Sequence, residues 1–381
     1  MSEKNTMMTV EVTPSEFKSI AIKTFSAKSP QPILVQGPGG TGKTSIAEQI
    51  AVQLKKKVFI VRGSGLDPVD LTGMPRSQMV KDEMETVYDR PMLLPRFDEE
   101  ALVFFDEINR SREEVLQTFL RVLEGRGTDS YKFNPEKHRI MAAFNPNDGS
   151  HQVNKMDKVL TNRGFLYSLR TSMQDFQEFM YSKKYDTAVM NYLTYSNKSL
   201  LVEPNADNDA EVAWASPRSW ENLAKLMTEV SDFTDNEVLK VSCASVGIEE
   251  GTAFTAFRCD PDRPVRALDV LTDYTDDLKK KFIKQQAEKR LDKASVTMSD
   301  LVLIINTEWQ DGYMPKLKQF WPTVKENELK AMLLKGIEAG GKTGGKDKES
   351  LFDKVVFGLG ITEELSTLLS KHDMAMKGRK K

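Results

Sequence analysis

The first 170 residues alternate between short apolar runs and longer stretches in which apolar residues recur with a helical period. Helices are expected at 13–25, 42–55 and 111–124. Continuous apolar runs are typical of strands buried on both faces, and they lie at 33–35, 58–61, 101–105 and 140–144, with a fifth candidate at 164–169. This order predicts an α/β domain over residues 1–170, with a mainly parallel sheet between layers of helices.

A long insert at about 63–99 separates the second apolar run from the third. Residues 79–87 within it are expected to form a hairpin with charges at its tip. Long insertions in α/β domains are usually functional or mobile. We regard residues 74–87 of the insert, with Met74, Met79 and Met84, and the loop 128–137 as candidate surfaces for a partner protein. Simple packing or disorder is the alternative for both segments.

Beyond residue 170 the pattern is helical. Residues 171–262 predict a helical lid, and 265–381 predict a mostly helical, highly charged extension. Within the extension we expect a flexible Gly/Lys linker at 339–348 and a disordered basic tail at 377–381. The basic stretches 279–284 and 289–293 are interpreted as solvated helix faces, with a binding surface as the alternative.

The segment after the first apolar run fits the phosphate-binding pattern G-x-x-x-x-G-K-[ST]. A buried strand precedes it and an amphipathic helix follows, which is the order that phosphate binding requires. Glycines allow backbone N–H groups to close around phosphates, and the helix N-terminus adds partial positive charge. Lys43 is expected to reach the β- and γ-phosphates, and the Thr44 hydroxyl to bind Mg²⁺. The predicted nucleotide-binding residues are Gly37, Pro38, Gly39, Gly40, Thr41, Gly42, Lys43 and Thr44.

The same pattern matches once more at Gly336–Thr343. A charged amphipathic helix precedes this second match, and no buried strand or apolar helix flanks it. We therefore reject it as a phosphate site, because its structural context is absent.

Three polar residues follow buried strands and are expected beside the phosphate loop. Asp106 and Glu107 end the run 101–105, and Asn145 ends the run 140–144. Carboxyl ends of parallel strands face the ligand crevice of such sheets. Asp106 can therefore hold Mg²⁺, Glu107 can accept a proton from the attacking water, and Asn145 can orient that water against the γ-phosphate. A turn-forming asparagine is the alternative for Asn145.

Composition narrows the function classes. The chain has 381 residues, a formal net charge of −2 and two cysteines, Cys243 and Cys259. This length suggests two or three domains. The near-neutral charge gives no global field for nucleic acid, and the cysteines imply no disulfide framework. The three histidines show no zinc-ligand spacing with the cysteines. Because no run of 18 apolar residues occurs, we expect no membrane span and a cytoplasmic location.

Six motifs, in order, resemble those of the MoxR group of AAA+ ATPases, which includes CbbQ/NorQ, GvpN and CobS-like ATPases. The resemblance covers roughly residues 13–260 and leaves 265–381 without a counterpart. Asn162 and Gly164 depart from the group's L-x-D-R-F element. The resembling segments are Gly37–Thr44, Asp67–Gly73, Asp106–Arg110 (the D-E-I-N-R signature), Ala143–Pro146, Leu160–Arg163 and Ala215–Arg218.

The resemblance implies a P-loop AAA+ (ASCE) fold and roles for three arginines. Arg163 would act across the subunit interface as an arginine finger, and Arg218, at the start of the sensor-2 helix, would contact the γ-phosphate. Arg110 is a weaker interface candidate. Surface salt bridges are the alternative for Arg163 and a structural role for Arg218. The resemblance also implies a homo-oligomeric ring, expected to be a hexamer, and a partner with a von Willebrand factor A-type domain.

Together these features predict Mg²⁺-dependent ATP hydrolysis that drives remodelling or activation of a partner protein. Two other functions stay open. One is a nucleic-acid-dependent motor of the McrB or MCM kind, for which residues 279–293 and the basic tail could supply contacts. The other is a scaffold that binds ATP only to assemble, against which Glu107 and Asn145 argue.

Overall fold

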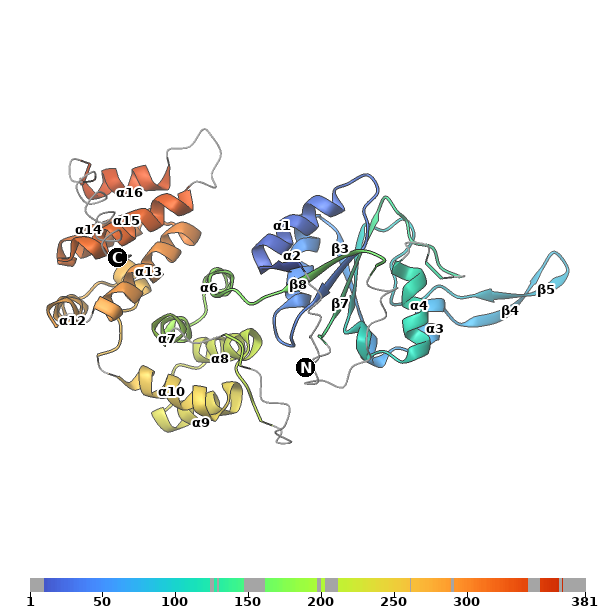
Figure 1. The fold of residues 1–381 in the computed structure, drawn as a ribbon, viewed down its shortest axis with the longest axis horizontal. Helices are drawn as coiled ribbons and strands as arrows, with labels where there is room; N and C mark the ends of the chain where they lie inside the picture. The colour runs from blue at the N-terminus through green and yellow to red at the C-terminus, as the bar shows by residue number, and fades with distance from the viewer. Residues whose placement is uncertain are drawn as a thin grey trace, which may run out of the picture. The chain divides into compact units, whose positions relative to one another are not determined.

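The computed structural model describes two compact units of the chain (Figure 1). The first contains the described residues up to Asp175 together with Ser216–Arg218, and the second contains the others. The described residues are 10–123, 127–128, 130–146, 162–196, 200–202, 212–260, 262–288, 291–341, 350–362 and 365.

The first unit is built on a six-stranded sheet in which every neighbouring pair is parallel. The strand order is β1-β8-β2-β7-β6-β3. All five strands expected from the sequence are confirmed. The strands are β1 (Val10–Val12), β2 (Ile33–Gln36), β3 (Lys57–Arg62), β6 (Ala101–Asp106), β7 (His138–Phe144) and β8 (Phe165–Leu169).

Successive residues of the central strands pack on opposite faces of the sheet, which explains their continuous apolar sequences. In β6, Leu102 and Phe104 join the core beneath α1 (Pro14–Phe25) and α2 (Lys43–Gln53). Val103 and Phe105 join the core on the other face, with residues of α3 (Pro68–Thr72) and α4 (Glu113–Leu123). The expected three-layer P-loop α/β architecture is therefore confirmed (Figure 1).

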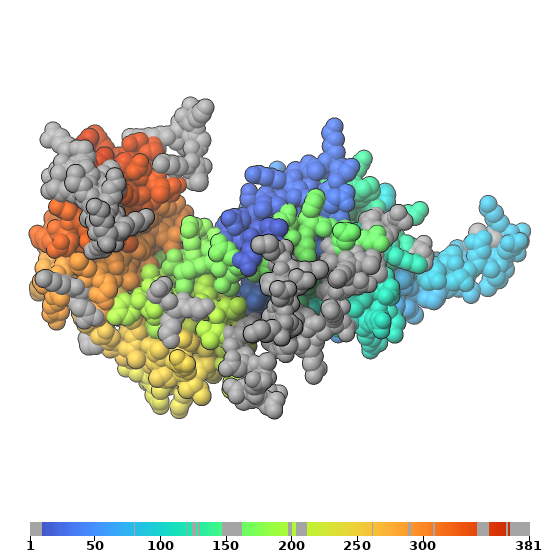
Figure 2. Space-filling model, in the orientation of Figure 1, coloured from blue at the N-terminus to red at the C-terminus, as the bar shows by residue number. Residues whose placement is uncertain are grey.

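The insert forms the predicted hairpin, and it is longer than the sequence suggested. Strands β4 (Pro75–Val80) and β5 (Glu83–Tyr88) pair in antiparallel register. Lys81 and Asp82 form the two-residue tip with φ of 50° and 66°, as a type I′ turn requires. The hairpin stands out from the rest of its unit (Figure 2).

The loop 128–137 differs from the expectation, because its described apolar side chains pack inward. Tyr131 and Phe133 are buried in the core beside α4. The Tyr131 hydroxyl donates to the Pro95 carbonyl at 2.8 Å, and the Asn134 amide donates to the Phe97 carbonyl at 2.9 Å. These contacts hold the loop against the body of the unit and favour packing for its buried residues. Lys132, Pro135 and Glu136 are exposed, so a client surface here stays a prediction.

The second unit is helical in its described part (Figure 1). Most described residues of the segments that we assigned to a lid and to an extension fall within this one unit, whereas 171–175 and Ser216–Arg218 group with the first. The division between lid and extension near residue 262 stays a prediction. The first five helices are α6 (Met173–Ser182), α7 (Ala188–Ser196), α8 (Pro217–Glu229), α9 (Asp235–Val246) and α10 (Ile248–Cys259). They are followed by α11 (Ala267–Thr272), α12 (Asp276–Ala287), α13 (Leu291–Glu308), α14 (Tyr313–Phe320), α15 (Asn327–Gly341) and α16 (Leu351–Leu359).

Helix α15 corrects one boundary and supports the rejection of the second phosphate-loop match. The helix continues to Gly341, so residues 339–341 are helical and do not belong to a flexible linker. A Cβ on Gly336 would lie 2.6 Å from the Val302 side chain, so this glycine permits close packing of α15 on α13. Residues 342–349 and the basic tail lie outside the described residues.

Part of the basic stretch is also buried, contrary to the expected solvated face. Lys293 is only 2% exposed, and its ammonium group contacts the carboxylates of Asp260 at 3.3 Å and Asp262 at 2.9 Å. A buried lysine needs such partners, because burial of an unpaired charge is costly. Among the described residues as a whole, no helix is long and apolar enough to cross a membrane.

Candidate nucleotide-binding site

The predicted site residues converge where three adjacent strands end. Strands β2, β7 and β6 are neighbours in the sheet and run in the same direction. Their carboxyl ends lead into Gly37, Asn145 and Asp106–Glu107 respectively. In open α/β sheets this edge is where ligands bind.

The phosphate loop turns sharply between β2 and α2. Gly40 and Gly42 have φ of 74° and 83°, a region that side chains other than glycine rarely enter. The Gly37 N–H donates to the Phe144 carbonyl at 3.3 Å, and the Thr41 hydroxyl donates to the Pro38 carbonyl at 2.9 Å. The loop is thus tied to β7 and to itself, and it delivers the chain into the N-terminus of α2, where anions bind.

Lys43 lies beneath this loop. Its side chain is 7% exposed, and its Nζ donates to the carbonyls of Gly37 at 2.7 Å and Pro38 at 2.8 Å and to Asn145 Oδ1 at 3.1 Å. Burial lowers the pKa of Lys43 to about 8, although the nearby Asp106 carboxylate opposes this shift. Desolvation disfavours the charged form of a buried ammonium group, and a nearby anion favours it. A bound phosphate would therefore stabilise the protonated form of Lys43.

Thr44 and Asp106 form the candidate metal ligands. The Thr44 hydroxyl donates to Asp106 Oδ2 at 2.7 Å, and Asp106 is buried at the end of β6. A hydroxyl and a carboxylate side by side supply the hard oxygen ligands that Mg²⁺ prefers when it is also bound to phosphates. The residues present therefore fit a Mg²⁺–nucleotide complex.

Glu107 occupies a strained backbone position beside this pair. Its φ and ψ are 52° and 40°, which is the left-handed region. Residues other than glycine seldom adopt this conformation, and such strain clusters at functional sites. The Glu107 carboxylate accepts a hydrogen bond from Arg110 Nη1 at 3.1 Å, and both side chains are about one-third exposed, at 32% and 37%. Arg110 therefore lies against the candidate general base in this conformation.

Asn145 is held by Asn109, a residue whose role the sequence does not predict. Asn109 is fully buried, and its Nδ2 donates to the Asn145 carbonyl at 2.8 Å. The Asn145 N–H donates in return to Asn109 Oδ1 at 3.3 Å. This pair of hydrogen bonds fixes the backbone at 145 and leaves the Asn145 side chain with Lys43. Asn109 lies inside the D-E-I-N-R motif, so the sequence locates it near the site, but its hydrogen bonds to the Asn145 backbone could not be predicted.

Arg218 is also brought to the phosphate loop, from a distant part of the sequence. Its backbone N–H donates to the Gly40 carbonyl at 3.2 Å, and a Cβ on Gly40 would lie 3.6 Å from the Cβ of Arg218. The Arg218 charge is close enough to lower the pKa of Lys43, after burial as the main cause. Helix α8 therefore begins at the loop, with an exposed arginine in its first turn.

Arg163 lies away from these residues. It precedes β8, whose first residue Phe165 pairs with Ile33, the first residue of β2. The phosphate loop follows the other end of β2, so Arg163 lies at the opposite edge of the sheet. Gly164 departs from the MoxR-group pattern, and close packing explains the glycine, because a Cβ there would lie 2.4 Å from the Pro32 carbonyl oxygen. The Leu160–Thr161 part of this motif lies outside the described residues.

A match to one protein-family model agrees with this geometry. Residues 32–164 match the family described as AAA domain (dynein-related subfamily). No curated protein matches the chain. Among solved structures, the Holliday-junction branch-migration motor RuvB of Thermotoga maritima is 17% identical, with a TM-score of 0.34, over 80% of this chain and 86% of that one.

A mutant of the same RuvB is 15% identical, with a TM-score of 0.35, over 79% of this chain and 85% of that chain. A closed-state Hsp104 with ATPγS and FITC-casein is 19% identical, with a TM-score of 0.32, over 45% of this chain and 34% of that chain. TM-scores this low support no conclusion about partners. The family match and the P-loop site at the edge of a parallel sheet together lead to one statement: residues 32–164 form an AAA-type ATPase domain.

Proposed function

We propose that this chain is a ring-forming, MoxR-like ATPase that remodels or activates a partner protein. The observation that carries the proposal is that the site residues and Arg163 lie at opposite ends of the parallel strands. The carboxyl edge gathers Lys43, Thr44, Asp106, Glu107 and Asn145. The amino edge carries Arg163, out of reach of that site in its own chain.

The proposed roles follow from the contacts. Gly37–Thr44 and Arg218 bind the nucleotide phosphates, Asn145 orients water, and Glu107 accepts its proton. Mg²⁺, held by Thr44 and Asp106, would neutralise charge on the phosphates when bound. Arg110 must leave Glu107 for the carboxylate to act on water, because the two are hydrogen-bonded at 3.1 Å.

Assembly follows from the position of Arg163. Strands rise about 3.3 Å per residue, so the length of β8 separates Arg163 from the catalytic edge of its own sheet by more than about 10 Å. An arginine that acts on phosphoryl transfer must contact the reacting group. We therefore infer that Arg163 serves a neighbouring copy in a closed ring, with a hexamer as the proposed size.

The β4–β5 hairpin is the proposed contact with the client. Met79 and Met84 form a cross-strand pair at its tip and are 60% and 66% exposed. Methionine surfaces adapt to varied partners. The MoxR resemblance adds a von Willebrand factor A-type domain as the proposed partner class, with the client or its adaptor bound at this tip.

The experiment uses Glu107→Gln, which should bind ATP and fail to cleave it. We would purify this variant from its native cell with Mg²⁺ and ATP and identify retained molecules by mass spectrometry. Lys43→Ala is the control that should not bind nucleotide. A protein retained only by Glu107→Gln, and lost when Met79 and Met84 are replaced by serine, supports remodelling through the hairpin.

Two results would instead favour the other functions. Retention of nucleic acid alone, lost as salt rises, would favour a nucleic-acid motor. Burial of Lys293 already removes one charge from the basic stretch that such a motor could use. If Glu107→Gln supported full biological function, hydrolysis would be dispensable and the chain would be an ATP-dependent scaffold.

A further inference from the structure

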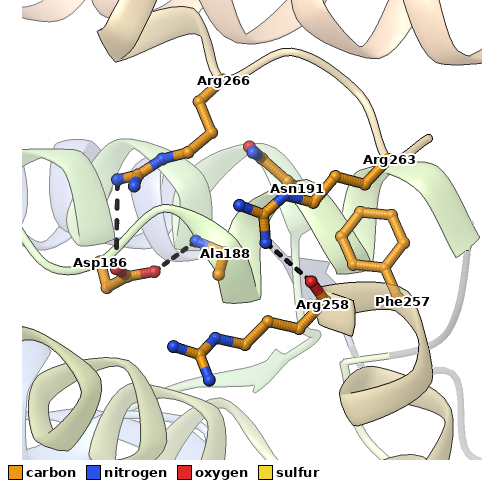
Figure 3. A pocket seen from close by; sticks show the side chains of 7 residues that line it. All are labelled: Asp186, Ala188, Asn191, Phe257, Arg258, Arg263 and Arg266. Atoms are coloured by element: carbon orange, nitrogen blue, oxygen red, sulfur yellow. Dashed lines mark hydrogen bonds and ion pairs between the residues drawn. The ribbon is translucent and has the colours of Figure 1, made fainter. Parts of the chain in front are cut away.

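Three arginine side chains converge on a small cavity in the second unit (Figure 3). Arg258 comes from the last turn of α10, and Arg263 and Arg266 follow in the segment that leads to α11. Asp186 and Ala188 line the opposite side, at the start of α7. The cavity has a volume of about 80 Å³. None of these residues belongs to the nucleotide site.

Two of the three guanidinium groups lack a carboxylate partner in the described part of the chain. The Arg263 Nη1 donates to the backbone carbonyl of Arg258 at 2.8 Å, which satisfies a carbonyl at the end of α10. The Arg258 guanidinium forms neither an ion pair nor a hydrogen bond with any described residue. Figure 3 shows its side chain extending beside Asp186 and Ala188 with no interaction drawn to either.

The third guanidinium group, that of Arg266, has only loose ion pairs with carboxylates. Arg266 Nε donates to the Thr187 hydroxyl at 2.9 Å. Its contacts with carboxylates are longer, 4.0 Å to Asp186 and 3.9 Å to Asp269. Asp186 also accepts from the Ala188 N–H at 2.7 Å, so its charge is shared with the start of α7.

The nearby carboxylates of Asp260 and Asp262 do not neutralise this excess of positive charge, because they are paired with Lys293. Asp260 and Asp262 both contact the buried ammonium group of Lys293. The pKa of Lys281 is lowered, first by burial and then by the charge of Arg263. The charged groups around the cavity are therefore unbalanced, with three arginines facing it against the single lining carboxylate of Asp186.

We propose that this cavity binds a small oxyanion of the phosphate type. Guanidinium groups present planar pairs of donors that match phosphate oxygens, and partial burial strengthens such contacts. A cavity needs about 10–15 Å³ to hold one water, so this one can accept a group of several heavy atoms. A bound anion would link α7 and α10 to the segment before α11, within one compact unit.

The test is calorimetric titration of the full chain with inorganic phosphate. All proteins carry Lys43→Ala, so that the nucleotide site contributes little. Phosphate should bind this parent, and Arg258→Gln should weaken binding at least about tenfold, because a charge-assisted hydrogen-bond pair is lost. Arg112→Gln is the matched control, since Arg112 is an exposed arginine paired with Asp67 in the other unit. Equal binding by all three proteins, or no binding by the parent, would overturn the proposal.

A second variant covers the case in which Arg258→Gln fails to fold. Ala188→Asp places a carboxylate at the cavity, in the first turn of α7, where acidic residues are favourable. It should raise the melting temperature without phosphate and abolish the further stabilisation that phosphate gives the parent. Stabilisation by phosphate that persists in this variant would contradict the site. Glycerol phosphate, titrated in parallel, distinguishes a monoester ligand from free phosphate by which of the two binds more tightly.

Discussion

At the scale of single residues, Lys43 links burial to nucleotide chemistry. Its ammonium group is surrounded by two backbone carbonyls and the Asn145 amide oxygen, all within 3.1 Å. Burial lowers the pKa of this ammonium group to about 8, although the charges of Asp106 and Glu107 oppose the shift. A phosphate beside the ammonium group would raise that pKa, because an opposite charge favours the charged form.

This coupling predicts that nucleotide affinity depends on alkaline pH. Below pH about 8, Lys43 is protonated in the free protein and affinity should be constant. As pH rises through 8, binding must take up a proton, so affinity should fall by up to about tenfold per pH unit. A fluorescent nucleotide titrated between about pH 6.5 and about pH 9.5 measures this slope. Lys43→Arg, which keeps its charge, should show a flat profile, and a flat profile in the unmodified protein would contradict the assignment.

Asn109 gives a second prediction at this scale. Asn109→Leu removes both hydrogen bonds to the Asn145 backbone and should lower the free energy of unfolding by about 1–3 kcal/mol. It should also reduce kcat by up to about 100-fold through misplacement of Asn145, with little change in nucleotide Kd.

Asn134→Leu is the matched control for this variant. Asn134 is another buried asparagine, placed just before β7 and away from the carboxyl edge. Its replacement should lower the free energy of unfolding without the selective loss of kcat at unchanged nucleotide Kd that is expected for Asn109→Leu. A similar pattern in both variants would reduce Asn109 to a structural residue.

The sequence predicted where most of these residues lie, because they end strands or follow the phosphate-loop pattern, and their roles stay predictions. Asp106, Glu107 and Asn145 were placed from the run of apolar residues before each. The bond partner of Asn109 could not be predicted, because it depends on how the chain after β6 approaches the end of β7. The contact between Glu107 and Arg110 depends in the same way on the left-handed backbone at 107.

At the scale of elements, continuous apolar runs and amphipathic stretches were predicted well, whereas the short strand β1 was not predicted. Strand β1 has three residues, too few to show a period, and it forms only because β8 offers an edge to pair with. The hairpin extends to Pro75 and Tyr88 because cross-strand pairing, which the sequence does not reveal, continues toward its base beyond the predicted residues 79–87.

Helix α15 shows how packing overrides local sequence preference. Its glycines suggested a linker, yet Gly336 lies against Val302 and Gly340 against Asn306 on α13. The Asn306 amide donates to the Gly336 carbonyl at 3.0 Å, which adds to the contact between the two helices. Close approach of the helices offsets the low helix propensity of glycine.

This contact predicts that Gly336→Ala destabilises the second unit. The new methyl group would meet Val302 at 2.6 Å, and overpacking costs about 1–3 kcal/mol against a helix-propensity gain of up to about 1 kcal/mol. Gly312→Ala is the control, because a Cβ at that position meets nothing within 4 Å. Urea unfolding should show a lower midpoint for Gly336→Ala alone. An unchanged or raised midpoint would show that α13 and α15 pack more loosely than described.

At the scale of the whole molecule, the parallel sheet separates two chemical functions onto its two edges. The order β2-β7-β6 brings the phosphate loop, Asn145 and Asp106–Glu107 together. The same parallel direction places Arg163 at the other edge, before β8. In the proposed ring, each copy would contribute its own nucleotide site and an arginine for a neighbouring site. We therefore expect ATPase activity per molecule to rise with protein concentration as copies assemble.

The most direct test mixes two inactive variants. Lys43→Ala should lack nucleotide binding but keep Arg163, whereas Arg163→Ala should bind nucleotide but lose about 10³–10⁵-fold in hydrolysis. If Arg163 acts on a neighbouring copy, an equimolar mixture should recover a substantial fraction of the unmodified ATPase rate, because each Arg163→Ala site can receive an arginine from an adjacent Lys43→Ala subunit. No recovery in the mixture, or full activity of Arg163→Ala alone, would contradict the account of a shared active site in a ring.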